Sequence, residues 1–363
     1  MKRKQITTER TDKMEATRLP QPDLYQDEKG RKYFYDNAKY ILITLVVLAH
    51  FISPLQSVHT SVKGLWNMIN TLHMPAMIFI SGFFAKSYIK KDGRINVQRP
   101  VTYIILYLAS QLAVGVFQHF MGIDVPLSIF YARESLWFLQ CLAAWYIMLP
   151  VIDKFKPMWV MIGAVAFGFI IGYDSNVGHL ASLSRMFVHF PFFLGGYYCT
   201  QMSIDKIFTK KAKIAAVIIL VSMFGISVVA APHFSASIIT CNTRYMAIAG
   251  IRDWPFLLRW CARALFYIAA FLLGISFLAL VPRRKTFFTK LGSRTLQVYI
   301  LHRFLYILEA ELKWYEPFES WWGVLVMALI AIVVSYILSL KIFAYPFEFL
   351  QSIKITKFLK KEE

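Results

Sequence analysis

Cysteine and acidic residues are scarce in this chain. Its four cysteines are scattered over 363 residues, with no Cys-x-x-Cys pair and no histidine at ligand spacing, so we expect no metal site. The 40 lysines and arginines outnumber 21 aspartates and glutamates, yet no basic and aromatic recognition motif accompanies the formal net charge of +19. We therefore expect no nucleic-acid partner. No internal repeat stands out, which weighs against the inverted-repeat plan of many secondary transporters.

Large apolar side chains are abundant. The chain is 57% hydrophobic and 16% aromatic, with a mean hydropathy of +0.50, well above an ordinary soluble domain. The first apolar segment follows a long polar stretch and lacks a small-residue cleavage site, so we do not expect a cleaved signal peptide. We predict an all-α, polytopic transmembrane bundle. Windows of about 19 residues give about ten membrane helices, at roughly 38–56, 65–85, 101–121, 135–152, 157–174, 184–200, 213–231, 260–281, 291–308 and 321–344.

Lysine and arginine alternate between the predicted connections, and this alternation sets the orientation. Cytoplasmic loops retain positive charge, and here the even-numbered connections carry it while most odd-numbered ones carry little. We therefore predict that both termini are cytoplasmic, and we attribute most of the net charge to topology and to contact with anionic membrane lipid. The basic residues of the predicted cytoplasmic connections are Lys86, Lys90, Lys91, Arg94, Arg99, Lys154, Lys156, Lys206, Lys210, Lys211, Lys213, Arg283, Arg284, Lys285 and Lys290.

The predicted organisation is one membrane domain with two short tails. Residues 1–33 are charged and carry few large apolar groups, so we expect a disordered basic cytoplasmic tail. Residues 34–346 form the membrane domain, and 347–363 form a second basic tail. The longest outer connection, near 232–259, has a length typical of loops that cover a site. We expect no extracytoplasmic soluble domain after the last helix.

Two ionisable residues lie inside the first apolar segment, YDNAKYILITLVVLAHFISPL. Eleven steps of 100° leave Lys39 and His50 about 20° apart and roughly 16 Å along the helix axis, so both project from one face. Ionisable groups in membrane helices are costly and mark functional sites by default, facing a packed interior or a wet cavity. A histidine can instead simply hydrogen-bond a neighbouring helix. Because neutral imidazole accepts a hydroxyl proton near neutral pH, His50 is the best candidate for a general base.

The second segment has a polar stripe and a basic continuation. His73, Met77 and Ser81 recur every fourth residue and share one face, beyond what a kink at Pro75 requires. The segment then runs into AKSYIKKDGRINVQR, which contains Arg94 and Arg99. Two explanations account equally well for the basic residues of this segment. One is the positive charge that cytoplasmic loops retain, and the other is bidentate binding of the phosphates of a nucleotide-like donor.

Later segments add further polar and aromatic candidates. Trp137 begins the fourth segment, where it is either an interfacial anchor or part of a site. The ninth segment, LGSRTLQVYILHRFLYIL, carries Thr295, Tyr299, His302 and Tyr306 at spacings of three and four. A stripe of this kind would be unfavourable against lipid, so we expect it to face the centre of the bundle.

The ordered set of these segments resembles the acyltransferase-3 family of integral-membrane acyltransferases. The resemblance is carried by YFYDNAKYILITLVVLAH, HMPAMIFISGFF, LWFL, HFPFFLGGYY and LGSRTLQVYILH, over about 33 to 345. In that family a basic residue and a histidine with ten residues between them mark the first membrane helix, and Lys39 and His50 fill these positions. The family often has an Arg-x-x-Arg pair after the second helix, where this chain has the more widely spaced Arg94 and Arg99.

The resemblance implies transfer of an acyl group, most often acetyl, from coenzyme A to a hydroxyl of a sugar or cell-surface glycan. Acetyl-CoA would enter from the cytoplasm with its phosphates near Lys39, Arg94 and Arg99. His50 would meet the thioester as general base, or as an acyl carrier. The family also implies a bacterial plasma membrane and possible glycan-assembly proteins as partners. The residues expected to line the acceptor side are His73, Ser81, Trp137, Tyr299 and His302.

Two other classes of protein remain open at this stage. A transporter or exporter of a saccharide or another solute would also use buried histidine and lysine, as a proton relay. A non-catalytic membrane scaffold is the third class. The enzyme releases free thiol from acetyl-CoA, whereas a carrier moves solute across a vesicle wall without cleaving a thioester.

Overall fold

The computed structural model describes residues 25–28, 30–90, 92–123, 128–174, 180–233 and 235–354. Within these ranges the chain is helical, with no β-strand and only two isolated β-bridges, between Gln26 and Lys32 and between Ile89 and Ile95. The predicted all-α class is therefore confirmed. Most of the predicted tail at 1–33, and residues 355–363 of the second tail, lie outside the described residues. The helix α14 crosses the predicted boundary at 346.

Each of the ten predicted segments contains a helix. The long helices are α2 (Tyr33–Phe51), α3 (Thr60–Ala85), α4 (Gln98–Phe120), α5 (Trp137–Ile152), α6 (Pro157–Ile170), α7 (Leu183–Tyr198), α9 (Lys210–Ala230), α11 (Cys261–Leu280), α12 (Thr295–Leu312) and α13 (Trp321–Leu338). Three short α-helices also form: α8 (Gln201–Asp205), α10 (Ser237–Thr240) and α14 (Tyr345–Ser352). The 3₁₀ turns are η1 (Pro54–Ser57), η2 (Glu134–Leu136), η3 (Leu180–Ser182), η4 (Lys206–Phe208), η5 (Tyr245–Ala247), η6 (Phe256–Leu258), η7 (Thr289–Arg294), η8 (Glu316–Phe318) and η9 (Lys341–Phe343).

Four helices of the described chain are long and apolar enough to cross a membrane. They are Thr60–Ala85, Gln98–Phe120, Lys210–Ala230 and the segment Phe256–Leu280 that contains α11. Membrane crossing by the other long helices, and the cytoplasmic placement of both termini, stay predictions.

Local sequence signals set where several helices begin. Thr209 accepts a hydrogen bond from the amide of Ala212 at the start of α9, and Ser320 does the same for Gly323 at the start of α13. Each hydroxyl satisfies a backbone donor that has no partner within the helix. Pro157 occupies the first position of α6, where its missing N–H costs nothing.

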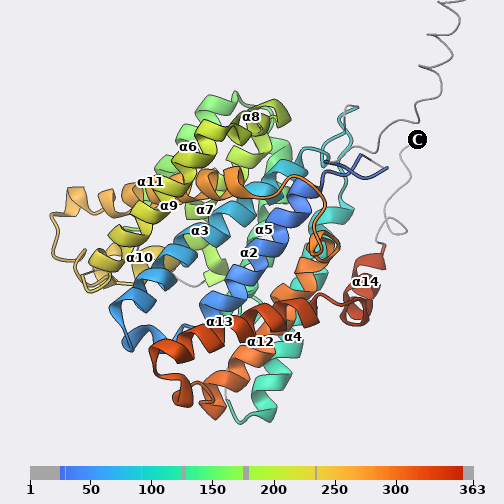
Figure 1. The fold of residues 1–363 in the computed structure, drawn as a ribbon. Coiled ribbons are helices and arrows are strands. Elements are labelled where there is room, and N and C mark those ends of the chain that lie inside the picture. The colour runs from blue at the N-terminus through green and yellow to red at the C-terminus, as the bar shows by residue number, and fades with distance from the viewer. Residues whose placement is uncertain are drawn as a thin grey trace, which may run out of the picture.

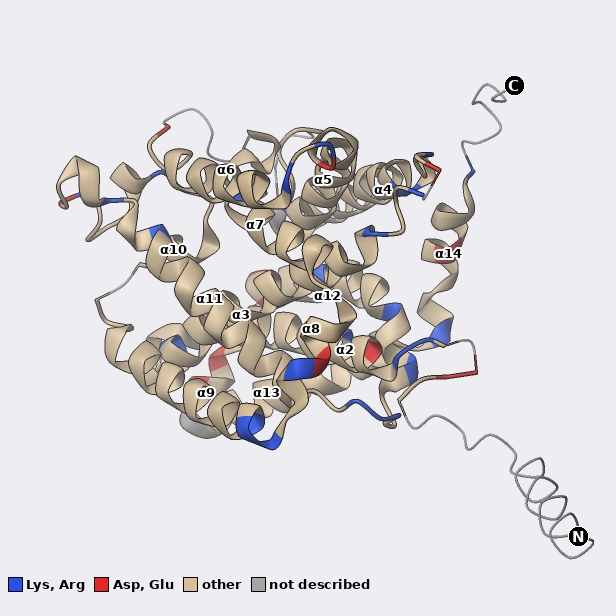
Figure 2. Ribbon diagram, turned by 90° about the horizontal axis from the view of Figure 1, so that it is seen from above, with Lys and Arg blue, Asp and Glu red and all other residues tan. Residues whose placement is uncertain are grey.

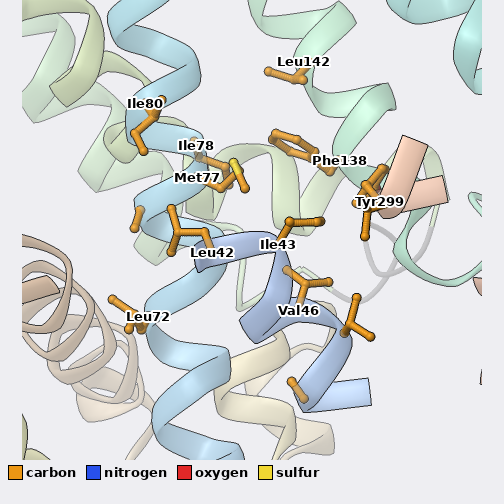
Figure 3. Packing of buried hydrophobic residues seen from close by; sticks show 14 of the residues in the cluster. Leu42, Ile43, Val46, Leu72, Met77, Ile78, Ile80, Phe138, Leu142 and Tyr299 are labelled. Carbon is orange, nitrogen blue, oxygen red and sulfur yellow. The ribbon is translucent and has the colours of Figure 1, made fainter. Parts of the chain in front are cut away.

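The helix α3 lies at the centre of the packing, in contact with α2, α7, α9 and α11, while α12 and α13 pack beside α2 (Figure 1). Apolar side chains of α2, α3, α5 and α12 meet in the core that Figure 3 shows, where Ile43, Met77, Phe138 and Tyr299 lie close together. The core is thus built from the same helices that carry the candidate site residues.

Two glycines allow α3 and α7 to approach closely. A Cβ atom on Gly82 of α3 would lie 1.9 Å from the carbonyl oxygen of Phe193 of α7. A Cβ atom on Gly196 of α7 would lie 1.9 Å from the carbonyl oxygen of Phe79 of α3. Small residues that bring two backbones together are a common means of helix association in membranes. These glycines therefore fix the distance between two helices that border the candidate site.

The start of α2 is held by polar contacts. Arg31 donates to both carboxylate oxygens of Asp36, at 2.6 and 2.7 Å. The hydrogen bond with Asp36 raises the pKa of Arg31 above its usual value. The side-chain amide of Asn37 donates to the carbonyl oxygens of Pro282 and Arg284, at 2.8 and 2.9 Å. Because these hydrogen bonds hold the N-terminal end of α2 in place, they also fix the position of Lys39, one turn later.

Charged residues concentrate on connections and helix ends rather than along the helices (Figure 2). The connections α2–α3 and α12–α13 lie at one end of the bundle, and the connections α3–α4 and α11–α12 lie at the other (Figure 1). The connections at the second end hold many of the lysines and arginines that predict the cytoplasmic side.

The substitution Gly82→Ala should destabilise the protein, because the new methyl group would meet the backbone of Phe193. We expect a loss of about 1–3 kcal/mol, the usual cost of overpacking, measured as a lower midpoint of thermal unfolding in detergent. The matched control is Gly225→Ala in α9, where nothing lies within 4 Å of the added Cβ. That control should be neutral or slightly stabilising, because alanine favours helix. Equal midpoints for the two variants would contradict the packing described here.

Candidate functional site

A cavity of about 480 Å³ lies between α2, α3, α4, α5 and α12 and holds four of the predicted site residues. We call it the Lys39 cavity. Its wall is mostly apolar, and many of its polar groups lie near the N-terminal ends of α2 and α4. The lining residues are Lys39, Ile43, Val46, Met74, Met77, Ser81, Phe84, Ser87, Gln98, Arg99, Thr102, Tyr103, Leu106, Phe138, Leu142, Tyr146, Thr295, Leu296, Tyr299 and Gln351.

Lys39 brings a cation to this cavity. Its Nζ lies 3.0 Å from Oδ1 of Asp36 and 5.8 Å from the ring centre of Phe84. A largely buried charge needs such compensation to avoid a desolvation cost. Because Arg31 also binds Asp36, the three side chains carry a net positive charge at the edge of the cavity.

The two arginines that follow α3 occupy different surroundings. Arg99 lines the Lys39 cavity and donates to the carbonyl oxygen of Phe84 at 3.0 Å and to Oγ of Ser87 at 2.7 Å. Arg94 does not line it; its side chain is 60% exposed and pairs with Asp92 at 2.6 Å. The hydrogen bonds from Arg94 hold the pKa of Asp92 below its usual range. The structure thus brings Lys39 and Arg99 together and leaves Arg94 outside the cavity.

A second cavity, of about 470 Å³, lies toward the other ends of α2 and α3 and is more polar. We call it the His50 cavity. It contains histidine, arginine and amide side chains as well as two indoles. The lining residues are His50, Ser53, Trp66, Asn70, Met74, Ala132, Ser135, Trp137, Arg185, His189, Ile239, Thr240, Asn242 and Tyr306.

His50 faces the interior of the bundle and meets α12. Its ring centre lies 5.2 Å from that of His302 and 5.1 Å from that of Tyr306. Nη1 of Arg303 lies 3.4 Å from Nδ1 of His50. A guanidinium can only donate, so Nδ1 is the acceptor and the neutral ring carries its proton on Nε2. Nδ1 is therefore the basic nitrogen of His50 in this arrangement.

Arg303 is almost completely buried, at 1% exposure. Its Cζ lies 4.6 Å from the ring centre of Tyr306, an arrangement in which the aromatic face attracts the cation. Tyr306 in turn lines the His50 cavity. Arg303 thus stands behind the cavity wall and contacts two of its residues.

The wall of the His50 cavity also contains Trp137, Arg185 and His189, which lie close together. The ring centre of Trp137 lies 5.2 Å from that of His189 and 5.2 Å from Cζ of Arg185. Nε of Arg185 donates to the carbonyl oxygen of Thr240 at 3.0 Å. An indole face beside a cation suits a sugar ring that carries hydroxyl or anionic groups.

Two predicted acceptor residues, His73 and His302, are buried behind the cavity walls rather than lining them. Nδ1 of His73 donates to the carbonyl oxygen of Ile69 at 2.7 Å, and Nδ1 of His302 donates to that of Val298 at 2.8 Å. Among the described residues, Nε2 of His302 has no hydrogen-bond partner. Both rings therefore keep a lone pair on Nε2, near His50 and its cavity.

Ser81 and Tyr299 line the Lys39 cavity, not the His50 cavity. The hydroxyl of Ser81 donates to the carbonyl oxygen of Met77 at 2.9 Å, and the hydroxyl of Tyr299 donates to that of Ser135. The polar stripe of the ninth segment faces inward as predicted. Its members divide between the cavities, with Thr295 and Tyr299 in the first and Tyr306 in the second.

Lys39 and His50 line different cavities, and the two cavities meet at Met74, which lines both. Ile43 and Val46 follow Lys39 along α2 on the wall of the Lys39 cavity. The shared face that the sequence predicts for Lys39 and His50 is thus turned inward. The two side chains therefore lie in separate spaces with a methionine between them, and the sequence-based expectation that they line one continuous passage is wrong.

Sequence reasoning missed Arg303 and Arg185. Each is a charged residue inside a predicted membrane segment, which is itself a signal of function. Arg303 follows His302 directly and Arg185 precedes His189 by one helical turn. In a helical projection Arg303 lies beside the polar stripe, near its edge, and not on it.

Comparison with known proteins shows the family of this chain. The family model for acyltransferase-3, described as an acyltransferase domain, matches residues 32–340, a range that contains every lining residue of the two cavities except Gln351. No curated protein and no solved structure gave a match. The family match favours the acyltransferase over the transporter and scaffold alternatives. Since the match spans nearly the whole chain, the protein belongs to the acyltransferase-3 family and is a membrane acyltransferase.

Proposed function

We propose that the protein is an integral-membrane O-acetyltransferase that moves an acetyl group from acetyl-CoA to a hydroxyl of a sugar or cell-surface glycan. The observation that carries this proposal is the pair of cavities that meet at Met74, one with cations at its edge and one with His50. A donor and an acceptor that enter from opposite ends would meet between them. The bacterial plasma membrane is the proposed location.

The Lys39 cavity is the proposed donor site. Lys39 and Arg99 supply positive charge for the phosphates of coenzyme A, at the end of the bundle that the sequence predicts to be cytoplasmic. The mostly apolar wall beyond them suits the pantetheine arm. Ser81 and Tyr299 lie on this wall, so we assign them to the donor path rather than to the acceptor.

His50 is the proposed general base. The contact from Arg303 to Nδ1 is long, at 3.4 Å, so an acceptor hydroxyl that approaches this nitrogen would displace it. Nδ1 takes the proton of the acceptor hydroxyl as its oxygen attacks the thioester carbonyl. The C–S bond breaks, and the coenzyme A thiolate leaves with that proton. An acyl-histidine intermediate at Nδ1 is the alternative route.

The His50 cavity is the proposed acceptor site. Trp137 lies on its wall with the guanidinium of Arg185 over the indole ring, and Arg185 and Asn242 supply hydrogen-bond donors for a sugar. His73 and His302 support this site from behind. Proteins that assemble or export the glycan are the proposed partners.

Replacing His50 with alanine should lower acetyl transfer by about 10²–10⁴-fold, the usual contribution of a general base. The measurement is thiol release from acetyl-CoA by the purified protein in detergent. His119→Ala, at an exposed position in the last turn of α4, is the matched control and should keep full activity. Retained activity in a folded His50→Ala variant would rule out the mechanism proposed here.

Charge reversal should separate the two arginines. Arg99→Glu should raise KM for acetyl-CoA by about tenfold or more, since a charged hydrogen bond contributes about 1.5–3 kcal/mol. Arg94→Glu should change KM much less, because Arg94 is exposed and already paired with Asp92. Steady-state kinetics at varied acetyl-CoA would show this. An effect of Arg94→Glu as large as that of Arg99→Glu would move the donor site toward the α3–α4 connection.

The substitution Met74→Trp should block passage between the cavities, because the larger side chain would occupy the space where they meet. We expect the loss of kcat to approach that of His50→Ala, on the order of 10²-fold. Binding of acetyl-CoA to the Lys39 cavity should change little. Met158→Trp, at an exposed position of α6, is the control. Normal kcat in Met74→Trp would mean that the donor does not cross at this residue.

A further inference from the structure

An apolar groove of about 340 Å³ lies on the outside of the bundle between α3, α9, α10 and α11. Most side chains of α9 are exposed, and this helix is among the four apolar enough to cross a membrane, so the groove borders the region that lipid would fill. Met223, Ile226, Ala230, Leu265 and Leu272 are among its lining residues. The part of α3 that lines the groove is its N-terminal half, which is also the half nearer to His50.

The groove adjoins the His50 cavity across the short helix α10. Ile238 lines the groove, Thr240 lines the His50 cavity, and Ile239 between them lines both. One turn of backbone therefore separates a hydrocarbon-like surface from a polar space that contains Arg185, His189 and Asn242. A ligand that occupies both must be apolar at one end and polar at the other.

Asn67 gives the groove a buried amide side chain. Its side chain lines the groove and the residue is only 5% exposed. Among the residues that the structure describes, its Oδ1 has no hydrogen-bond partner. A buried carbonyl oxygen without a donor is costly, and in native proteins such an atom usually meets a ligand or an ordered water. A hydroxyl or amide on the ligand would satisfy Oδ1.

We propose that the acceptor is a saccharide carried on a lipid, with its hydrocarbon chain in this groove and its sugar in the His50 cavity. This inference rests on the proposed acetyl transfer and names its acceptor class. A water-soluble polysaccharide would use the polar cavity and leave the groove unexplained. An ordinary phospholipid would fill the groove but present no sugar hydroxyl to His50. A lipid-linked sugar matches both surfaces and reaches the cavity sideways from the membrane.

The test uses membranes of the source organism that carry the full chain or a variant in place of the native gene, with radiolabelled acetyl-CoA as the probe. Labelled products are divided between organic solvent and water, and mild acid then releases the sugar from its lipid. Ala230→Phe fills the groove, and Ala215→Phe places the same side chain at an exposed position of the same helix. Asn67→Leu removes the buried amide with little change in volume.

With the native chain we expect the label in the organic phase, moving to water after mild acid. Ala230→Phe should lower this product by about tenfold, because each methylene excluded from the groove weakens binding several-fold. Asn67→Leu should lower it by about threefold or more, the effect of one hydrogen bond. Ala215→Phe should have no effect. Gel filtration in detergent shows that each variant is folded, and Asn67→Leu remains a test if Ala230→Phe is not.

Three results would overturn the inference. Label found only in water-soluble product, together with thiol release, would refute the lipid-borne acceptor and leave acetyl transfer intact. Normal activity in folded Ala230→Phe and Asn67→Leu would show that the groove holds ordinary lipid only. Neither label nor thiol release from the native chain would show that the proposed function itself is wrong.

Discussion

The contact between His50 of α2 and Arg303 of α12 is the constraint around which the site is arranged. Both side chains lie within an apolar bundle, where an ionisable group has to turn inward and find polar or aromatic neighbours. Their contact at 3.4 Å, with Tyr306 under the guanidinium, joins the inward faces of α2 and α12. The faces of both helices that carry polar residues consequently border the two cavities.

The helix α3 provides the second constraint, because it borders both cavities and the lipid-facing groove. Gly82 and Gly196 bring it against α7 at backbone distance, which makes its position rigid. Met74 lies on α3 between the cavities, so the place where donor and acceptor would meet is set by a packed helix. A reaction between two substrates from opposite ends needs such a fixed meeting point.

The donor side shows how far sequence reasoning reaches. The positive charge near the second helix was evident from the sequence, but Arg94 and Arg99 were equivalent candidates. The fold separates them, because Arg99 begins the helix α4 that lines the cavity, whereas Arg94 belongs to the preceding turn and pairs with Asp92. Five residues of spacing cannot reveal such a difference, since the path of a connection depends on what it packs against.

The sequence by itself determined the helical class, the ten apolar segments, the family and the inward faces of the first and ninth segments. The helical class, the segments and the inward faces follow from composition and from the 3.6-residue period, which are local properties, whereas the family follows from the resemblance of the ordered motifs. Only the tertiary structure decided that Lys39 and His50 belong to separate cavities. It also decided that Tyr299 lines the Lys39 cavity while His302, on the same stripe, is buried behind the walls. The contacts of Arg303 and Arg185 with the site likewise came from the tertiary structure. Which helices become neighbours depends on contacts between residues far apart in the chain, and no local period encodes those contacts.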